Sequence, residues 1–121
     1  MISLSLFRNE QTQEFAPGQV IFQTGETGKS MYVVIEGEVE IRVGDLVAET
    51  VTPGGIFGEM ALIDKAERSA SAVAKTVARV VAIDDRRFGF LVGQTPYFAL
   101  QVMSTMAERL RRANQRITPS N

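Results

Sequence analysis

Residue types suited to binding a ligand are concentrated in one stretch of the chain, residues 53–70. Gly58 has no side chain and lets the backbone approach a ligand closely, and N–H groups at the start of a helical turn suit an anion. Arg68 offers a planar guanidinium that matches phosphate oxygens, and Glu59 offers a carboxylate that accepts from sugar hydroxyl groups. Together they fit a sugar phosphate. From these residues alone, a structural ion pair between Arg68 and Glu59 is at least as good an interpretation.

The composition argues against the common catalytic and metal sites. The chain contains no His and no Cys. Ser-His-Asp and Cys-His catalysis are therefore excluded, and a zinc site is not expected. A metal-dependent cupin barrel would also lack its His ligands. We predict that the protein is not an enzyme and holds no metal or cofactor.

Length and charge indicate a small protein with no general affinity for polyanions. A chain of 121 residues fits one domain, which we expect to span residues 1–121. The formal net charge of −1 creates no field toward nucleic acid or an anionic membrane. No apolar stretch approaches the roughly 18 residues of a membrane span, and the N-terminus does not resemble a secretion signal. We expect a cytoplasmic location and no membrane segment.

The first two thirds of the chain read as short strands separated by glycine turns. Hydrophobic and β-branched runs occupy residues 20–22, 31–35, 71–74 and 77–83. Residues 38–43 alternate between charged and aliphatic side chains, which is typical of a half-buried strand. Short strands at this spacing predict a mainly β fold with flanking helices, as a barrel or a jelly-roll sandwich.

Two helices are expected after residue 83. Asp84 or Asp85 is suited to cap a short helix that ends near Val92, and Thr95-Pro96 is typical of the start of a longer one. Apolar residues then recur at intervals of three and four, as in a coiled-coil seam. This seam consists of Ala99, Met103, Met106, Leu110, Ala113 and Ile117. Packing on the chain's own barrel and formation of a homodimer are equally good interpretations of it.

The motif Phe57-Gly58-Glu59-Met60-Ala61-Leu62, followed by Arg68-Ser69-Ala70, resembles the phosphate-binding cassette of the cyclic nucleotide-binding domain family. Bacterial catabolite activator proteins, protein kinase A regulatory subunits and cyclic nucleotide-gated channels belong to this family. Residues 15–22, 31–39 and 80–88 extend the resemblance over nearly the whole chain. It implies a β-roll, or double-stranded jelly roll, over about residues 10–83, with a short cassette helix, and C-terminal helices over about 85–117.

The resemblance also implies a role for each cassette residue. Arg68 pairs with the cyclic phosphate, Ser69 adds a hydroxyl donor, and Glu59 accepts from the ribose 2′-OH. Backbone amides around Met60, Ala61 and Ala70 complete the phosphate site. The ligand-binding residues expected in the cassette are Phe57, Gly58, Glu59, Met60, Ala61, Arg68, Ser69 and Ala70.

The base is expected to lie against the long C-terminal helix. By similarity to catabolite activators, Asn114 is placed to hydrogen-bond an adenine edge, whereas Ala113 has no group to offer. Arg109 is a second candidate for ligand contact, or else a solvated helix charge. Ser69 is compatible with cyclic AMP, and Thr at this position is the more common companion of cyclic GMP in the family. We predict cyclic AMP as the ligand, with cyclic GMP as the alternative.

These features predict a cyclic nucleotide sensor that signals by movement of its C-terminal helix to an unidentified downstream protein. One alternative is an interaction or dimerisation module with a vestigial pocket. Another is the N-terminal fragment of a Crp/Fnr-like transcription regulator. The chain ends where the helix-turn-helix of such a regulator would begin, so we expect no DNA-binding domain in it. A basic cluster near the end has the simpler explanation of favourable charge at a helix C-terminus. It consists of Arg109, Arg111, Arg112 and Arg116.

Overall fold

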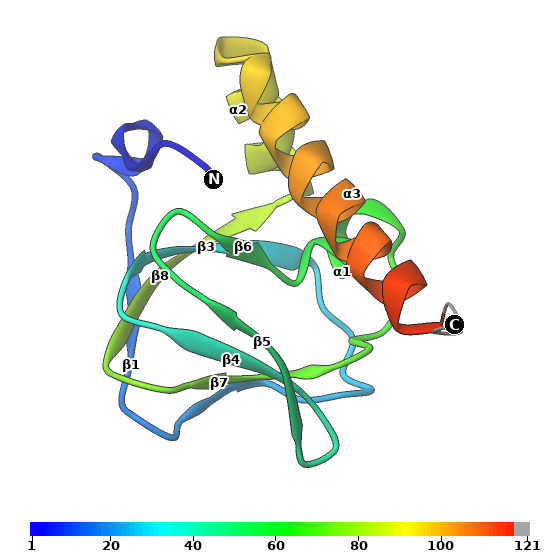
Figure 1. Ribbon diagram of the computed structural model, residues 1–121. Coiled ribbons are helices and arrows are strands. Elements are labelled where there is room, and N and C mark those ends of the chain that lie inside the picture. The colour runs from blue at the N-terminus through cyan, green and yellow to red at the C-terminus, as the bar shows by residue number, and fades with distance from the viewer. Residues whose placement is uncertain (118–121) are drawn as a thin grey trace.

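A computed structural model describes residues 1–117, and their side chains as far as residue 115. Eight strands form two four-stranded sheets in which all paired strands are antiparallel (Figure 1). The first sheet has the order β1 (Gln13–Phe15), β8 (Ala78–Asp84), β3 (Ser30–Glu36) and β6 (Ile56–Phe57). The second has the order β2 (Val20–Phe22), β7 (Ser71–Ala74), β4 (Val39–Val43) and β5 (Leu46–Val51). The predicted mainly β roll is confirmed.

Four helical segments accompany the sheets. They are the 3-10 helix η1 (Leu4–Phe7), the cassette helix α1 (Glu59–Ile63), α2 (Asp85–Gln94) and α3 (Tyr97–Ile117). The Asp84 carboxylate accepts a hydrogen bond from the Arg87 amide at 2.8 Å, which confirms the expected cap of α2. No helix in the described part of the chain is both long enough and apolar enough to cross a membrane.

Strands β1, β5 and β6 were not predicted from the sequence. β1 and β6 have only three and two residues, too few to show a period. In β5, a bulge in the pairing with β4 displaces the register between Ile41 and Arg42. Because a bulge adds one residue to a strand, the alternation of side chains is broken where the sequence would reveal it.

One hydrophobic core lies between the two sheets. Alternate residues of a strand point to opposite faces, so each strand contributes every second side chain to this core. Val34 from β3 and Val39 from β4 are fully buried there. Three aromatic rings gather at the end of this core that is nearest to the Arg68 guanidinium. They belong to Phe22, Tyr32 and Phe57, with Tyr32 and Phe57 stacked at 5.1 Å between centroids.

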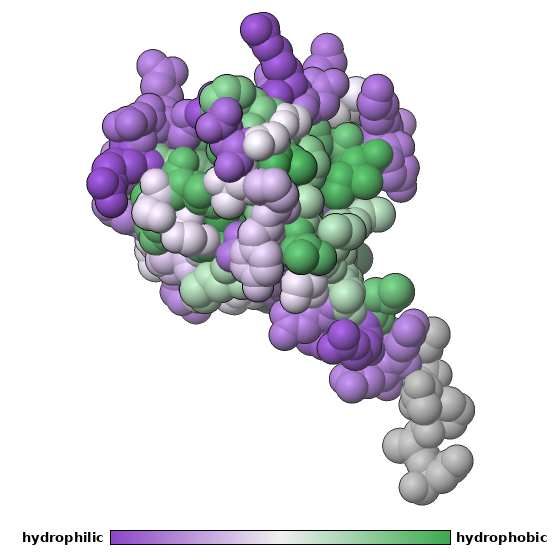
Figure 2. Space-filling model, turned by 90° about the horizontal axis from the view of Figure 1, so that it is seen from above, coloured by the Kyte–Doolittle hydropathy of each residue, from purple (hydrophilic) through white to green (hydrophobic). Residues whose placement is uncertain are grey.

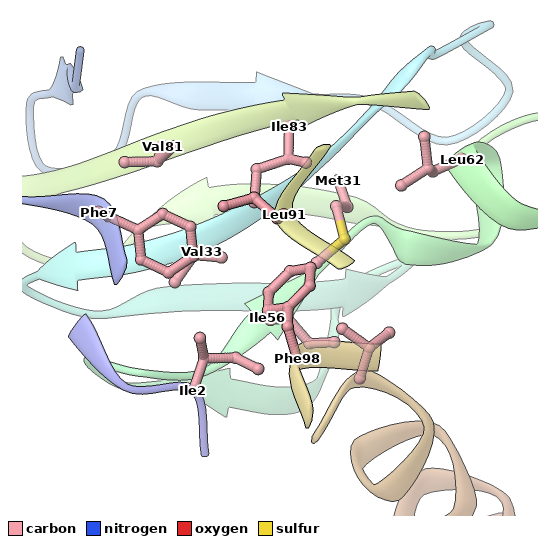
Figure 3. Packing of buried hydrophobic residues seen from close by; sticks show 11 residues of the cluster. Ile2, Phe7, Met31, Val33, Ile56, Leu62, Val81, Ile83, Leu91 and Phe98 are labelled. Carbon is pink, nitrogen blue, oxygen red and sulfur yellow. The ribbon is translucent and has the colours of Figure 1, made fainter. Parts of the chain in front are cut away.

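A second core covers the outer face of the first sheet (Figure 3). Met31 and Val33 of β3 point away from the sandwich and meet helical side chains, among them Leu91 and Phe98. Phe98 also makes an edge contact with Phe7 of η1, at 6.3 Å between ring centroids. The first sheet is thus buried on both of its faces, and the helices are packed onto the sheet that carries β6.

The helix α3 is anchored at its beginning and exposed toward its end. Phe98 and Val102 are fully buried, whereas every described side chain from Leu110 to Gln115 is exposed. The predicted seam is divided by this packing. Met103, Leu110 and Ala113 face solvent, Ala99 and Met106 are half-buried, and the side chain of Ile117 lies outside the described residues.

Candidate ligand-binding site

A cavity of about 240 Å³ opens between the cassette, the β4–β5 hairpin and α3. Nine of the ten residues predicted for the site line this cavity: Phe57, Gly58, Glu59, Met60, Ala61, Arg68, Ser69, Ala70 and Arg109. The remaining lining residues are Phe22, Ile41, Ala48, Glu49, Glu67 and Arg112. Asn114 lies exposed on α3 and is not one of the lining residues, so its contact with the base stays a prediction.

The cassette turns sharply at Gly58 before α1 begins. Gly58 has a φ of 75°, in the left-handed region that favours glycine. A Cβ at this position would lie 2.7 Å from Nη1 of Arg68 and 3.2 Å from the Phe22 ring. The missing side chain therefore serves both the turn and the space that Arg68 occupies.

Arg68 is a buried cation with an incomplete set of partners. Its side chain lies over the Phe22 ring at 4.1 Å, and the residue is only 6% exposed. Nη1 donates to the Gly58 carbonyl and Nη2 to the Ser30 carbonyl, each at 2.8 Å. Nε is buried without a hydrogen-bond partner among the described residues. Burial lowers the pKa of Arg68, and the charges of Tyr32, Glu26 and Glu59 offset this only in part.

The structure does not support a structural ion pair between Arg68 and Glu59. No carboxylate in the described part of the chain forms a salt bridge with Arg68. Glu59, which is 5% exposed, pairs instead with Arg109 of α3. A buried guanidinium that lacks a carboxylate is electrostatically incomplete, because burying a charge is costly unless it is paired.

Arg109 ties α3 to the pocket. Its guanidinium contacts the Glu59 carboxylate and the Ile56 carbonyl, and it binds Glu49 of β5 at 2.9 and 3.1 Å. Burial opposes the charge of Arg109, but the hydrogen bonds and charges of Glu49 and Glu59 outweigh it and raise the pKa of Arg109. Of its two predicted roles, the solvated helix charge is wrong, because the side chain is only 22% exposed and fully engaged.

The six remaining lining residues and Gly28 were not among the predicted site residues, and Gly28, Glu49 and Arg112 are among those that contact the charged groups of the site. Gly28 lies against Arg68, and a Cβ there would come within 2.4 Å of the guanidinium. Nothing in the sequence separates Gly28 from the other turn glycines. Arg112 contacts Glu49 at 3.4 Å. Glu49 shares with Val51 the face of β5 that turns toward the interior, but the bulge in the β4–β5 pairing hides this alternation in the sequence.

The buried Arg68, the buried Glu59 carboxylate and the left-handed turn at Gly58 form one wall of the cavity. The family model for the cyclic nucleotide-binding domain matches residues 12–95. The chain belongs to this family. This cyclic nucleotide-binding domain is 34% identical over 118 residues to the Cyclic AMP receptor protein of Thermus thermophilus, covering 93% of this chain and 53% of that protein.

Solved structures agree with this assignment. The crystal structure of the Thermus thermophilus catabolite activator protein matches with a TM-score of 0.79 and 29% identity, over 93% of this chain and 61% of that one. A structure described under a cyclic-GMP-dependent signalling pathway of bacterial phytopathogenesis matches with a TM-score of 0.68 and 32% identity, over 94% and 89% of the two chains. The cyclic nucleotide-binding domain spans about half the length of the receptor protein that it resembles.

Replacing Gly58 by Ala should destabilise the domain by about 1–3 kcal/mol, because a left-handed backbone then carries a Cβ that also strikes Arg68. Urea denaturation measures this loss. Gly89→Ala is the control, since Gly89 lies within α2 and has open space where its Cβ would stand. It should be neutral or stabilising by up to about 1 kcal/mol. Equal stabilities for the two variants would contradict the account of the turn.

Proposed function

We propose that the chain is a non-catalytic, cytoplasmic sensor, a single domain over residues 1–121 that binds a 3′,5′-cyclic nucleotide in the described cavity. The observation that carries this proposal is Arg68, a buried guanidinium that has no hydrogen-bond partner at Nε and forms no salt bridge within the described residues. A cyclic phosphate supplies the missing negative charge. A vestigial pocket would have no use for an unpaired buried cation, so the interaction-module alternative is disfavoured.

Different cassette residues bind different parts of the nucleotide. Arg68 and Ser69 bind the phosphate, and charge-assisted hydrogen bonds of this kind contribute about 1.5–3 kcal/mol each. Glu59 accepts from the ribose 2′-OH beside its existing contact with Arg109. Support for cyclic AMP as the ligand comes from Ser69 and from the name of the Thermus receptor protein. Cyclic GMP is the alternative ligand, because a structurally similar protein is described under a cyclic-GMP-dependent signalling pathway.

Arg68→Ala should weaken binding of cyclic AMP at least tenfold, because the buried cation that faces the phosphate is lost. Thermal melts with cyclic AMP, cyclic GMP and linear AMP test this. At a ligand concentration of a hundred times Kd, the wild-type Tm should rise by about 5–15 °C with a cyclic nucleotide, and linear AMP should have no effect.

The control for this experiment is Arg86→Ala, since Arg86 is exposed on α2 and does not line the cavity. A melt of each variant without ligand shows whether it is folded. Near wild-type affinity in folded Arg68→Ala would refute the phosphate assignment.

We propose that the nucleotide signals through α3. The beginning of this helix is fixed by Phe98 and Val102, whereas its contact with the cavity consists of Arg109 and Arg112. A ligand that touches both the cassette and α3 binds best when the helix is docked, and it therefore shifts α3 toward that position.

Amide hydrogen exchange with and without cyclic AMP tests the movement. Binding should slow exchange over residues 97–117, most strongly beyond Ala107, because the side chains from Leu110 to Gln115 are exposed. The amides of α2, whose residues do not line the cavity, should be unaffected. Unchanged exchange in α3 at saturating ligand would contradict the proposal that the nucleotide signals through this helix.

We propose further that α3 pairs with a second copy of the chain. Leu100, Met103 and Leu110 are 56, 53 and 63% exposed, and with the exposed Ala107 they repeat at intervals of three, four and three residues. This is the heptad spacing of a two-helix contact, and a face of this kind is self-complementary in a symmetric dimer. Figure 2 shows exposed hydrophobic residues among the polar ones on the helical side of the molecule.

Leu110→Lys should convert the dimer to a monomer, because a charge would be buried at the centre of the helix pair. Light scattering after gel filtration measures the mass. The control Gln115→Lys adds the same charge to α3 outside the row formed by Leu100, Met103, Ala107 and Leu110, and this variant should remain dimeric. A wild-type mass equal to one chain, with or without cyclic AMP, would rule out this dimer.

A further inference from the structure

Glu49 is a charged residue at a position where the barrel should be apolar. In the β4–β5 pairing, Val39 lies opposite Val51 and Ile41 opposite Glu49. Val39 and Val51 are buried in the core between the sheets. Residues two apart on a strand share a face, so Ile41 and Glu49 continue this inward row, and both line the cavity. A residue that breaks the local pattern in this way points to function.

Glu49 belongs to the part of the cavity wall that the phosphate and ribose contacts leave for the base. Given the proposed function, Arg68 and Ser69 hold the phosphate, and Glu59 holds the ribose. The lining residues outside the cassette and β2 come from β4, β5 and α3: Ile41, Ala48, Glu49, Arg109 and Arg112. Ile41 and Ala48 offer apolar surface to the faces of a purine ring. Besides Arg109, Glu49 and Arg112 are the polar groups of this part of the wall, whereas Glu67 lines the cavity from the cassette, next to Arg68 in the sequence.

Glu49 and Arg112 have opposite hydrogen-bonding capacities, since a guanidinium can only donate. The Glu49 carboxylate can only accept hydrogen bonds, and two oxygens provide about four lone-pair sites. Arg109 occupies both oxygens, at 2.9 and 3.1 Å, and Arg112 approaches one of them at 3.4 Å. Arg109 has Glu59 and the Ile56 carbonyl as further partners, so it stays paired if Glu49 turns toward a ligand. Arg112 is 46% exposed and free to move with it.

Guanine matches such a pair better than adenine does. Its N1–H and 2-amino group are adjacent donors that fit the two oxygens of one carboxylate, and the neighbouring O6 accepts from a guanidinium. Adenine offers a single amino group flanked by acceptor nitrogens, so the second carboxylate oxygen would face a lone pair. We propose that Glu49 is a base-selecting residue that accepts from guanine N1–H and the 2-amino group, and that the cavity takes cyclic GMP through it. This inference rests on the proposed function and narrows its ligand.

The test is calorimetry on the full chain with cyclic AMP, cyclic GMP and cyclic IMP, whose base lacks only the 2-amino group of guanine. Glu49→Gln should weaken the binding of cyclic GMP at least tenfold and the binding of cyclic AMP less than threefold. Wild type should prefer cyclic GMP to cyclic IMP, and the variant should lose this preference. Glu40→Gln is the matched control, because Glu40 lies on the opposite face of β4 and pairs with Arg42. It should leave all three affinities unchanged.

The possible failures are distinguishable. If folded Glu49→Gln lost affinity for cyclic AMP and cyclic GMP equally, Glu49 would be a positioning residue for Arg109, and base selection would be overturned. The proposed sensor function would still stand. Unchanged affinities in this variant would overturn base selection as well. If wild type bound none of the three nucleotides, the proposed function itself would fall, and base selection with it.

Discussion

The burial of the Arg68 guanidinium is the constraint on which the site depends. A buried cation needs space, an aromatic ring to lie against and backbone acceptors, and each is supplied by a different part of the chain. Gly28 and Gly58 leave the space, Phe22 provides the ring, and the Ser30 and Gly58 carbonyls accept two of its hydrogen bonds. No carboxylate of the described residues forms a salt bridge with this guanidinium, so its burial is electrostatically costly to the fold.

The helical layer is attached to the barrel by two different kinds of interaction. Phe98 and Val102 hold the first turns of α3 by hydrophobic burial, which is insensitive to what the cavity contains. Farther along, Arg109 and Arg112 hold it through carboxylates that line the cavity. One end of the helix is therefore held by the hydrophobic core, and the other by ion pairs with carboxylates that line the cavity.

Much of this architecture could be predicted from the sequence, because periodic strands, helix caps and the cassette motif are local signals. The alternation of residues 38–43 and the cap at Asp84 are examples of such local information. The partners of Glu59 and Arg68 were not predictable, because ion pairs are chosen by tertiary packing, and Arg109 lies 50 residues from Glu59. Glu49 was overlooked because a bulge hides the alternation of β5, although its inward position has a clear physical meaning once the register is known.

The shortest strand of the fold contributes to both cores. In β6, Ile56 packs among the helices and its neighbour Phe57 packs between the sheets, and the Ile56 carbonyl accepts from Arg109. The two cores therefore meet at this strand, as they also do at Val33–Val34 of β3 and Val80–Val81 of β8. Because the β6 carbonyl at this junction accepts from Arg109, the backbone between the two cores is also a contact point for α3.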